Sequence, residues 1–292
     1  MVTPVVTPAL PSCVLREAYC SRAEFLAKVT GCDTTSLVPG GNTAANTAAL
    51  DGILREASGE VDAICNQVLA ATQQVQAGRY RYRSDGRVWV PLDQTPVVSV
   101  DAVSLGASPG ELTALTDLSG VWLGRKSVHV PTSALSASTG LSDGGWLYAQ
   151  VTYTAGWANT TLAATTLVSA TSLTVTDAVG IVPGLSLRIY DGVSTEQVVV
   201  ASSYAAGATT VPLAAAMASA HTTAGVAISA MPEAVRKATR LLAAASIKRR
   251  GSEAVVLGAV SDEPVRKVGG EPGMSADRAA AEELLRTFKR TA

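Results

Sequence analysis

The chain has 292 residues, a hydrophobic fraction of 47% and a formal net charge of -1 at pH 7. This length exceeds the usual size of a single domain, so we expect one domain plus a second module, or two domains. The near-neutral charge argues against binding of nucleic acid or a membrane surface by electrostatic attraction alone. Only 16% of the residues are charged, against roughly 25% in typical soluble domains. This indicates either a surface covered by partner subunits or a compositional bias toward alanine.

The N-terminal sequence and the cysteines bear on location. MVTPVVTPALPSCVLREAYC has neither the basic start nor the apolar block of a secretion signal, and no apolar run reaches the roughly 18 residues that a membrane span needs. We therefore expect the chain to be made in the cytoplasm. Cys13, Cys20, Cys32 and Cys65 form no CxxC pair and have no histidine nearby, which favours reduced, partly buried thiols over zinc or disulfides.

A short helix and then a long one are predicted in the first quarter. Ser21 and Glu24 have the spacing of a capping box at the start of the short helix. The stretch from Gly31 to Asn42 contains glycine, asparagine and proline and breaks the chain. Apolar residues then recur at helical spacing, so we expect a long helix that packs one stripe against a sheet. The stripe consists of Leu50, Ile53, Leu54, Ala57, Val61, Ile64, Cys65, Val68 and Leu69.

Residues 79–157 are predicted to form β structure. Asp85-Gly86 stands between two runs of strand-forming residues, which is a strong hairpin signal. Aromatic residues interleave here with four arginines. Two interpretations stay open: a stacking platform for single-stranded nucleic acid, or an aromatic core beside a solvated basic edge strand, and we favour the second. The residues concerned are Arg79, Arg81, Arg83 and Arg87, with Tyr80, Tyr82, Trp89, Trp122, Trp146, Tyr148, Tyr153 and Trp157.

Residues 158–229 differ in composition from the region before them. They contain few charged residues among many threonines, valines, alanines and glycines, and strand-like segments recur at short intervals between turn residues. We predict a compact all-β module, a small barrel or sandwich. The segments are SLTVTD, LSLRIYDG, EQVVVASS, ATTVPL and GVAIS.

The last quarter is predicted to hold two helices joined by an arm. Pro232 and Glu233 suit the first turn of a helix with one apolar stripe. This helix ends in a basic cluster that needs no ligand, because cations are favourable at a helix C-terminus. A flexible arm with two prolines follows, and a final amphipathic helix is expected over residues 275–290. The basic cluster is Lys248, Arg249 and Arg250.

Motifs of catalysis are missing from the sequence. It contains no GxxxxGK, HExxH or GxGxxG, and no GxSxG between a predicted strand and a predicted helix. His129 alternates with valines in a predicted strand and His221 lies in a predicted loop, so we interpret both as structural. The chain is therefore expected not to be an enzyme and to bind no cofactor and no metal. An enzyme built around a cofactor without a recognisable motif is the remaining alternative.

The order of these elements resembles that of the head-tail connector, or adaptor, proteins of tailed bacteriophages. The resemblance rests on Tyr19 before the short capped helix, the long helix DGILREASGEVDAICNQV, the strands VWVPLDQTPVVSVDAV, the corner VTYTAGW and the helix MPEAVRKATRLLAAASIKRR. It covers roughly three quarters of the chain. In that family a Tyr-x-x-Gly-aromatic corner leads almost directly into a helix that starts with proline. Here residues 158–229 separate the two halves, and they therefore resemble an insertion.

The resemblance implies a structural role in a virion. Connectors of this kind form a ring, usually of twelve subunits, beneath the portal, and they join it to the head-tail stopper or tail-completion protein while double-stranded DNA passes through the channel. They are not enzymes. We accordingly expect a homo-oligomer at the head-tail junction, or neck, of a virion, with no sequence-specific DNA binding and no membrane partner.

The resemblance also implies an architecture of the α+β class. Residues 1–157 and 230–250 would form a helical body with a small antiparallel β region, and residues 158–229 the inserted all-β module. Residues 251–292 would form a flexible C-terminal arm that ends in an amphipathic helix and reaches toward the portal. The basic cluster would belong to the helical body. The expected portal contacts are Leu284, Leu285, Arg286 and Phe288.

Two other functions stay open. Another neck or tail-completion protein would share this composition and these partners, and it would differ in not touching the portal. A nucleic-acid-binding protein would use the basic segments 79–87 and 248–250, and its binding of DNA would be strong and sensitive to salt.

Overall fold

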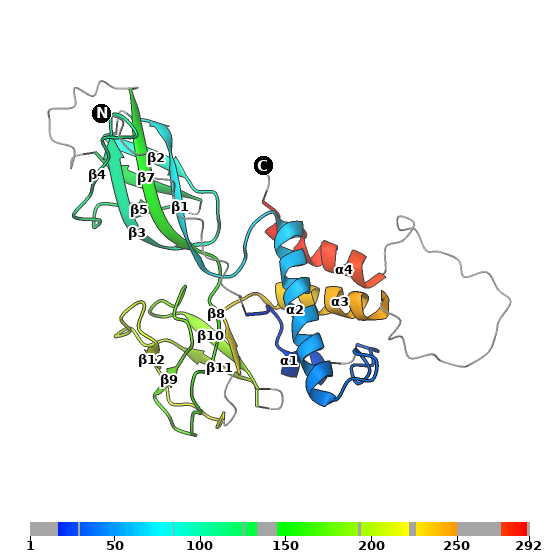
Figure 1. Cartoon of the computed structure of the whole chain (residues 1–292). Helices are drawn as coiled ribbons and strands as arrows, with labels where there is room; N and C mark the ends of the chain where they lie inside the picture. The colour runs from blue at the N-terminus through cyan, green and yellow to red at the C-terminus, as the bar shows by residue number, and fades with distance from the viewer. Residues whose placement is uncertain are drawn as a thin grey trace, which may run out of the picture.

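The computed structural model describes residues 17–28, 30–83, 85–124, 126–132, 145–191, 194–221, 226–249 and 276–290. In this part of the chain, buried apolar side chains form three hydrophobic clusters, each enclosed by its own elements. Figure 1 shows the three parts that result: a helical core, a β sandwich (residues 72–155) and a smaller β module (residues 158–230). The helical core combines residues from both ends of the described sequence, so the two β parts lie between its halves.

The helical core contains four α-helices in the described residues. The long helix α2 packs against the other three, and it buries its predicted apolar stripe against them and not against a sheet. The long helix is therefore confirmed, but the sheet expected as its partner is wrong. The helices are α1 (Arg22–Ala27), α2 (Thr43–Cys65), α3 (Glu233–Arg249) and α4 (Ala276–Leu285), which continues into a 3₁₀ turn (Arg286–Phe288).

Side-chain caps set the ends of α1 and α2. At the start of α2, the Asn42 side chain accepts a hydrogen bond from the Ala45 amide at 2.9 Å. Asn66 ends the helix in the left-handed region, with φ at 52°. Ser21 caps α1 by accepting from the Glu24 amide at 3.2 Å, as the predicted capping box requires. The Glu24 carboxylate does not return to the cap, because it is buried inside the protein.

The β sandwich consists of two antiparallel sheets that face each other. The first has the strand order β1-β7-β3-β4 and the second β2-β6-β5. Alternate residues of each strand point inward, and those of both sheets form one cluster that includes Val88, Val128, Leu147 and Val151. The strands are β1 (Thr72–Arg81), β2 (Arg87–Pro91), β3 (Val97–Gly106), β4 (Thr113–Ala114), β5 (Trp122–Leu123), β6 (Ser127–Pro131) and β7 (Trp146–Ala155).

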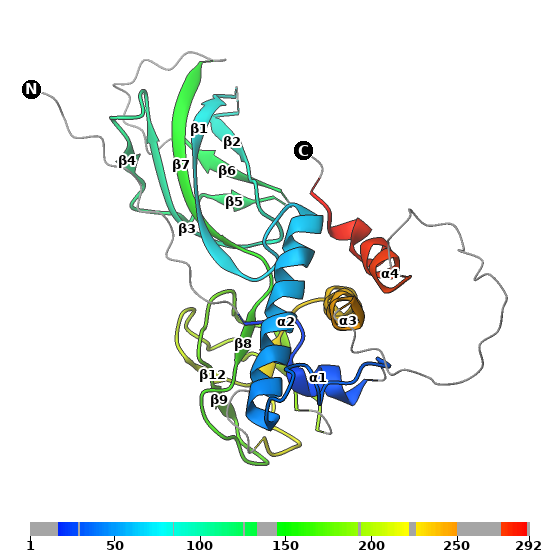
Figure 2. The ribbon, with the colours of Figure 1, turned by 45° about the vertical axis from the view of Figure 1, so that its right-hand side comes forward.

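The predicted hairpin at Asp85-Gly86 is confirmed. It joins β1 to β2, and Gly86 has a φ of 74° with its amide donating to the Arg83 carbonyl. Because β1 pairs with β7 and β2 pairs with β6, this hairpin also connects the two sheets. Figure 2 shows β1 and β7 running side by side along the length of the sandwich.

The β module contains six short strands in the described residues, and the predicted strand segments of this region are confirmed. One sheet has the order β11-β10-β13-β8, and β12 and β9 form a second, two-stranded sheet. Their buried side chains form a cluster separate from those of the other two parts. The strands are β8 (Asn159–Thr161), β9 (Ser172–Thr174), β10 (Ser186–Tyr190), β11 (Glu196–Val199), β12 (Thr210–Pro212) and β13 (Ala227–Ser229).

The corner VTYTAGW and the start of α3 lie side by side, although residues 158–229 separate them in the sequence. β8 leaves the corner, β13 returns toward α3, and these two strands pair antiparallel. Next to them, the Ala230 amide donates to the Ala158 carbonyl at 2.9 Å. As a consequence, Trp157 and Met231 both pack in the helical core.

The corner itself requires a glycine. Gly156 has a φ of 106°, and a Cβ at this position would lie 2.5 Å from the Ala70 carbonyl oxygen. This close approach lets the next residue pair with the segment after α2. The Trp157 amide donates to the Leu69 carbonyl, and the Trp157 carbonyl accepts from the Ala71 amide, both at 2.8 Å. The corner is thus held against the segment that follows α2.

The predicted fold class, a helical body with a small β region, is wrong. Among the described residues the strands form four sheets and the chain is mostly β. The physical reason is that the two sheets of the sandwich bury their inner faces against each other, so the strands need no helix to cover them. The domain boundaries proposed at 157/158, 229/230 and 250/251 stay a prediction, and residues 250–275 lie outside the described residues.

The final predicted helix is present as α4, and it packs against α3 and α2. Ala281 and Leu285 on its inner side are fully buried in the helical core. Each places apolar surface against the other helices, and burial of a leucine side chain contributes about 1.5–3 kcal/mol. The last helix is therefore part of the packed structure of the chain itself.

We expect Leu285→Ala to lower the free energy of unfolding by about 2–5 kcal/mol, because it leaves a cavity between α4 and its neighbours. Arg286→Ala at the adjacent exposed position is the matched control and should change it by less than about 0.5 kcal/mol. Urea unfolding followed by circular dichroism measures both values. If Leu285→Ala costs no more than the control, α4 does not belong to the core.

Candidate interaction surfaces

The predicted portal contacts lie on α4 and the 3₁₀ turn, but most of them face the protein's own core. Leu285 is fully buried, and Leu284 and Phe288 pack partly against the helical core. The Phe288 ring meets Trp157 edge to face, with ring centroids 5.7 Å apart. Arg286 projects into solvent, with 77% of its side chain exposed. Arg286 is thus the accessible member of the set, and a portal contact by these residues stays a prediction.

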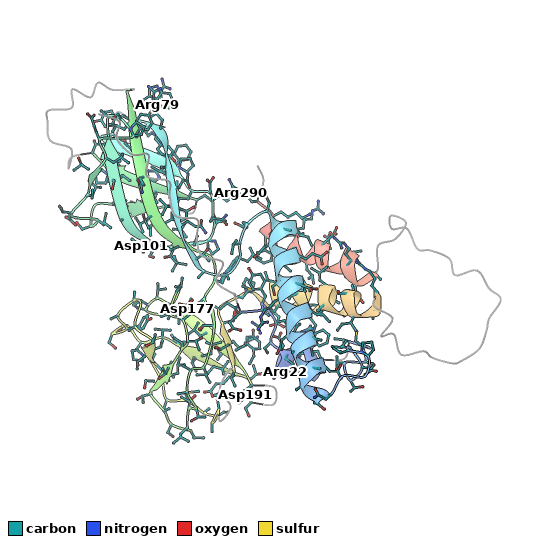
Figure 3. All side chains as sticks on the ribbon, in the orientation of Figure 1. Arg22, Arg79, Asp101, Asp177, Asp191 and Arg290 are labelled. Atoms are coloured by element: carbon teal, nitrogen blue, oxygen red, sulfur yellow. The ribbon has the colours of Figure 1, made fainter. Side chains whose placement is uncertain are left out.

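The residues after α4 also connect the helical core to the β sandwich. The Arg290 guanidinium lies 2.7 Å from the Asp93 carboxylate, in the segment after β2. Gln67 donates through Nε2 to the Phe288 carbonyl at 2.9 Å and accepts at Oε1 from the Thr95 amide. Figure 3 shows Arg290 between the two parts. The C-terminal residues therefore hold the sandwich and the helices together.

The predicted basic cluster at the end of α3 is partly used inside the chain. Lys248 lies with its Nζ 2.7 Å from the Asp277 carboxylate on α4. Arg249 is exposed at the surface of the helix. Arg250 lies outside the described residues. Lys248 thus contributes to the packing of α4 on α3, and a nucleic-acid contact by the cluster stays untested.

A buried arginine joins the helical core to the β module. Arg236 on α3 has no solvent exposure, and its Nη2 donates to the Glu24 carboxylate on α1. The other carboxylate oxygen of Glu24 lies 3.6 Å from Nη1 of Arg240. On its far side the Arg236 guanidinium stacks over the Tyr190 ring of β10, at 3.5 Å from the ring centroid. We call Glu24, Arg236 and Tyr190 the arginine clamp.

The clamp balances a charge that water does not reach. Burying a cation is costly unless an opposite charge and further favourable contacts compensate for its lost hydration. Glu24, which is 5% exposed, supplies the opposite charge, and the Tyr190 ring supplies a cation–π contact. Burial raises the pKa of Tyr190 against the opposing effect of Arg236, so the ring faces the cation as a neutral phenol. The clamp is formed only when α1, α3 and β10 are docked together.

A cleft with a volume of about 440 Å³ opens at the same junction. Arg22 and Asp51 line its helical wall, and Tyr190 and Asp191 line its wall in the β module. The Arg22 Nη1 lies 2.9 Å from the Asp51 carboxylate, so these two charges are paired within one wall. Figure 3 labels Arg22 and Asp191 on the two sides of the junction. The cleft is therefore lined by residues of both the helical core and the β module and lies at the boundary between them.

The described cysteines are free thiols within the helical core. Cys20 and Cys65 are buried and Cys32 is partly exposed, as the sequence predicts, and Cys13 lies outside the described residues. Burial, followed by the nearby Asp62 charge, raises the pKa of Cys65 to about 11. Burial likewise raises the pKa of Cys20, with the Glu24 charge adding to the effect. Both thiols are therefore protonated and unreactive at neutral pH.

His221 is buried in the β module, where it contacts two carboxylates. Its Nδ1 lies 2.9 Å from Asp191, and its Nε2 lies 3.7 Å from Glu196. Glu196 also accepts hydrogen bonds from the amides of Ala218 and Ser219, which fixes the loop before the histidine. Within the described residues, no group of three or more His, Cys, Asp or Glu side chains is arranged so that it could hold a metal ion. The contacts of His221 are those of a residue that fixes local structure.

The arginines and tryptophans of the β sandwich are divided between its two outer faces. Arg79 stacks over the Trp146 ring, 5.0 Å from the centroid, on the outer face of the β1-β7 sheet. Trp89 and Trp122 lie on the outer face of the β2-β6-β5 sheet. All three tryptophans are about half exposed, so the predicted aromatic core is wrong for them. Because the two groups face opposite sides, they do not form one continuous stacking platform.

Comparison with known proteins finds weak likeness among solved structures. No known family profile matches the sequence, and no curated protein matches it. Among solved structures, the chain is similar to a chain of the "Neck of empty GTA particle computed with C6 symmetry". The two are 15% identical, and the likeness covers 96% of each chain at a TM-score of 0.37. A TM-score this low transfers neither fold nor function. None of the described helices is long and apolar enough to cross a membrane.

We expect Glu24→Gln to lower the free energy of unfolding by about 3–5 kcal/mol, because Arg236 keeps its charge and loses its buried partner. Asp51→Asn is the matched control: it removes the partner of Arg22 in an exposed pair and should cost less than about 1 kcal/mol. Scanning calorimetry compares the two variants with the unaltered protein. A loss for Glu24→Gln as small as the control's would mean that the clamp does not hold α1 against α3.

Proposed function

We propose that this protein is a structural, non-catalytic component of the neck of a phage-like particle. In this proposal, copies of the chain form a homo-oligomeric ring, of twelve subunits as in the family it resembles. The ring joins the portal of the head to the stopper or tail-completion protein and leaves a channel through which double-stranded DNA passes. No cofactor takes part in this role.

The position of the corner VTYTAGW carries the proposal. In connector proteins such a corner leads almost directly into a helix that starts with proline. Here the paired strands β8 and β13 bring Trp157 beside Met231, at the start of α3, despite the intervening residues 158–229. The corner and the helix thus have the neighbourhood that the family resemblance requires, and the β module projects from the point where they meet (Figure 1).

The surface of a single copy also supports an assembled state. Charged residues make up only 16% of the chain. Trp89, Trp122 and Trp146 are each about half exposed. Exposed tryptophans on a surface poor in charge are typical of protein interfaces, whose centres are enriched in aromatic residues and depleted in charge. These features favour a protein whose surface is covered by other copies and by neck partners.

The proposal is tested by imaging particles that contain the protein. We expect a closed ring of this chain between the portal and the tail, visible in averaged electron micrographs of particles and of the purified protein with its portal. The non-catalytic role predicts that the ring forms and attaches without any added cofactor. A protein that stays strictly monomeric and is absent from particles would contradict the proposal.

The predicted portal contact is tested separately at its accessible residue. We expect Arg286→Glu to weaken co-purification with the portal at least about tenfold, because it reverses a charge at the proposed contact, and tenfold corresponds to about 1.4 kcal/mol. Folding should be unchanged, because the side chain is exposed and its pair with Glu283 spans 3.8 Å at the surface. Arg55→Glu on the exposed side of α2 is the control. Equal portal binding by both variants would show that α4 does not provide the contact.

A further inference from the structure

Three aromatic side chains form a row across the outer face of the β2-β6-β5 sheet. Trp89 on β2 pairs with His129 on β6, which pairs with Trp122 on β5. The exposed fractions are 47% for Trp89 and 57% for Trp122, and the Trp122 and His129 rings lie 4.7 Å apart between centroids. We call these residues the aromatic row.

The outer face of this sheet also carries two prolines, and its valines point inward. Strand alternation places Pro91 and Pro131 on the same outer face as the aromatic row. The intervening residues, such as Val90 and Val130, point into the core of the sandwich. The outer face also carries Arg87, and its apolar part, made of the aromatic row and the two prolines, is open in a single copy. Since neighbouring strands are roughly 4.8 Å apart, Trp89 and Trp122 stand about 10 Å apart across the sheet.

The first residues of the chain have the composition of a ligand for such a row. MVTPVVTPALPSCVL carries no charged side chain, and Pro8 and Pro11 form a Pro-x-x-Pro motif. Segments with this motif favour the polyproline II conformation, with three residues per turn and a rise of about 3.1 Å per residue. Pro8 and Pro11 would then lie on one side of the segment, about 9 Å apart. This spacing matches the separation of Trp89 and Trp122.

We propose that the N-terminal segment of a second copy of this chain docks on the aromatic row through Pro8 and Pro11. Aromatic-lined surfaces bind polyproline II segments in this way, because each proline ring packs on an aromatic face and the stiff segment loses little entropy on binding. The contact rests on the proposed ring, in which it links one subunit to the next. It covers an apolar face and an apolar segment at the same time.

The chain's own geometry favours a second copy as the source of the segment. Five residues separate Pro11 from Glu17, whose carbonyl accepts from the Asn159 side chain at the base of the β module. These residues span at most about 20 Å. Gln76 on β1 donates to the Pro91 carbonyl, and Trp89 lies two residues before Pro91, nearer the hairpin that joins β1 to β2. The aromatic row therefore lies roughly six residues, or about 20 Å, along β1 from Thr72, and the length of the corner has to be added. A tether within one chain would therefore have to be fully extended and still cross the corner, which favours the segment of a second copy.

Photo-cross-linking of the purified full-length protein tests the contact without the portal or the tail. p-Benzoylphenylalanine replaces Ala9, and irradiation should give a product of twice the chain mass of 29.8 kDa. Mass spectrometry should place the link on the strands that carry Trp89 or Trp122. Pro8→Ala with Pro11→Ala should lower the yield about tenfold, and this pair of changes leaves the sandwich untouched.

A matched pair of tryptophan variants locates the partner surface. Trp122→Ala should also reduce the cross-link about tenfold, whereas Trp146→Ala on the opposite outer face should leave it unchanged. Circular dichroism checks that both variants fold. If Trp122→Ala does not fold, the variant with Pro8→Ala and Pro11→Ala tests the contact instead.

Three outcomes would overturn the proposal. The first is a cross-link that maps to residues outside the β2-β6-β5 sheet, and the second is a cross-link within one chain. The third is quenching of tryptophan fluorescence by single-stranded DNA in a protein that forms no cross-link, which would make the aromatic row a nucleic-acid platform. Because the experiment uses the isolated protein, its failure is distinct from failure to find a neck ring in particles.

Discussion

The Arg236 guanidinium carries a charge that no water surrounds, and the way this charge is balanced fixes how α1, α3 and β10 meet. Its carboxylate partner, Glu24, comes from α1, and the aromatic ring beneath it, Tyr190, comes from β10. Apolar side chains alone can pack in several orientations. The hydrogen bond between the guanidinium and the carboxylate has a direction and fixes α1 against α3, and the Tyr190 ring stacked on the same guanidinium positions β10 over them.

The second joint, between the helical core and the β sandwich, follows the same rule. Apolar packing fills the interior of each part, while directional contacts lie at the boundary. Gln67 accepts from the Thr95 amide, and Arg290 pairs with Asp93 across the boundary. The C-terminal helix therefore has a structural role in its own chain, and only its outer side, with Arg286, is open to a partner.

Patterns local to the sequence predicted α2, the Asp85-Gly86 hairpin and the strands of the β module, because each depends on neighbouring residues. Pairing between distant segments was not predictable in this way. An apolar strand face does not reveal whether a helix or a second sheet will cover it, and the sandwich was missed for this reason. Arg236 escaped notice because the stripe of α3 is apolar around it. Glu24 at the capping position was the one sequence feature that pointed to a buried ion pair, because its carboxylate turns inward and accepts from Arg236.

The pairing of β8 with β13 has a consequence for how such proteins diversify. Both ends of the β module enter the rest of the chain at one point, separated only by the width of a strand pair, roughly 4.8 Å. Any compact segment whose ends are this close fits the same attachment without altering the path of the corner or of α3. The junction is therefore a site of exchange, at which evolution can remove, enlarge or replace a whole appendage while the scaffold keeps its shape.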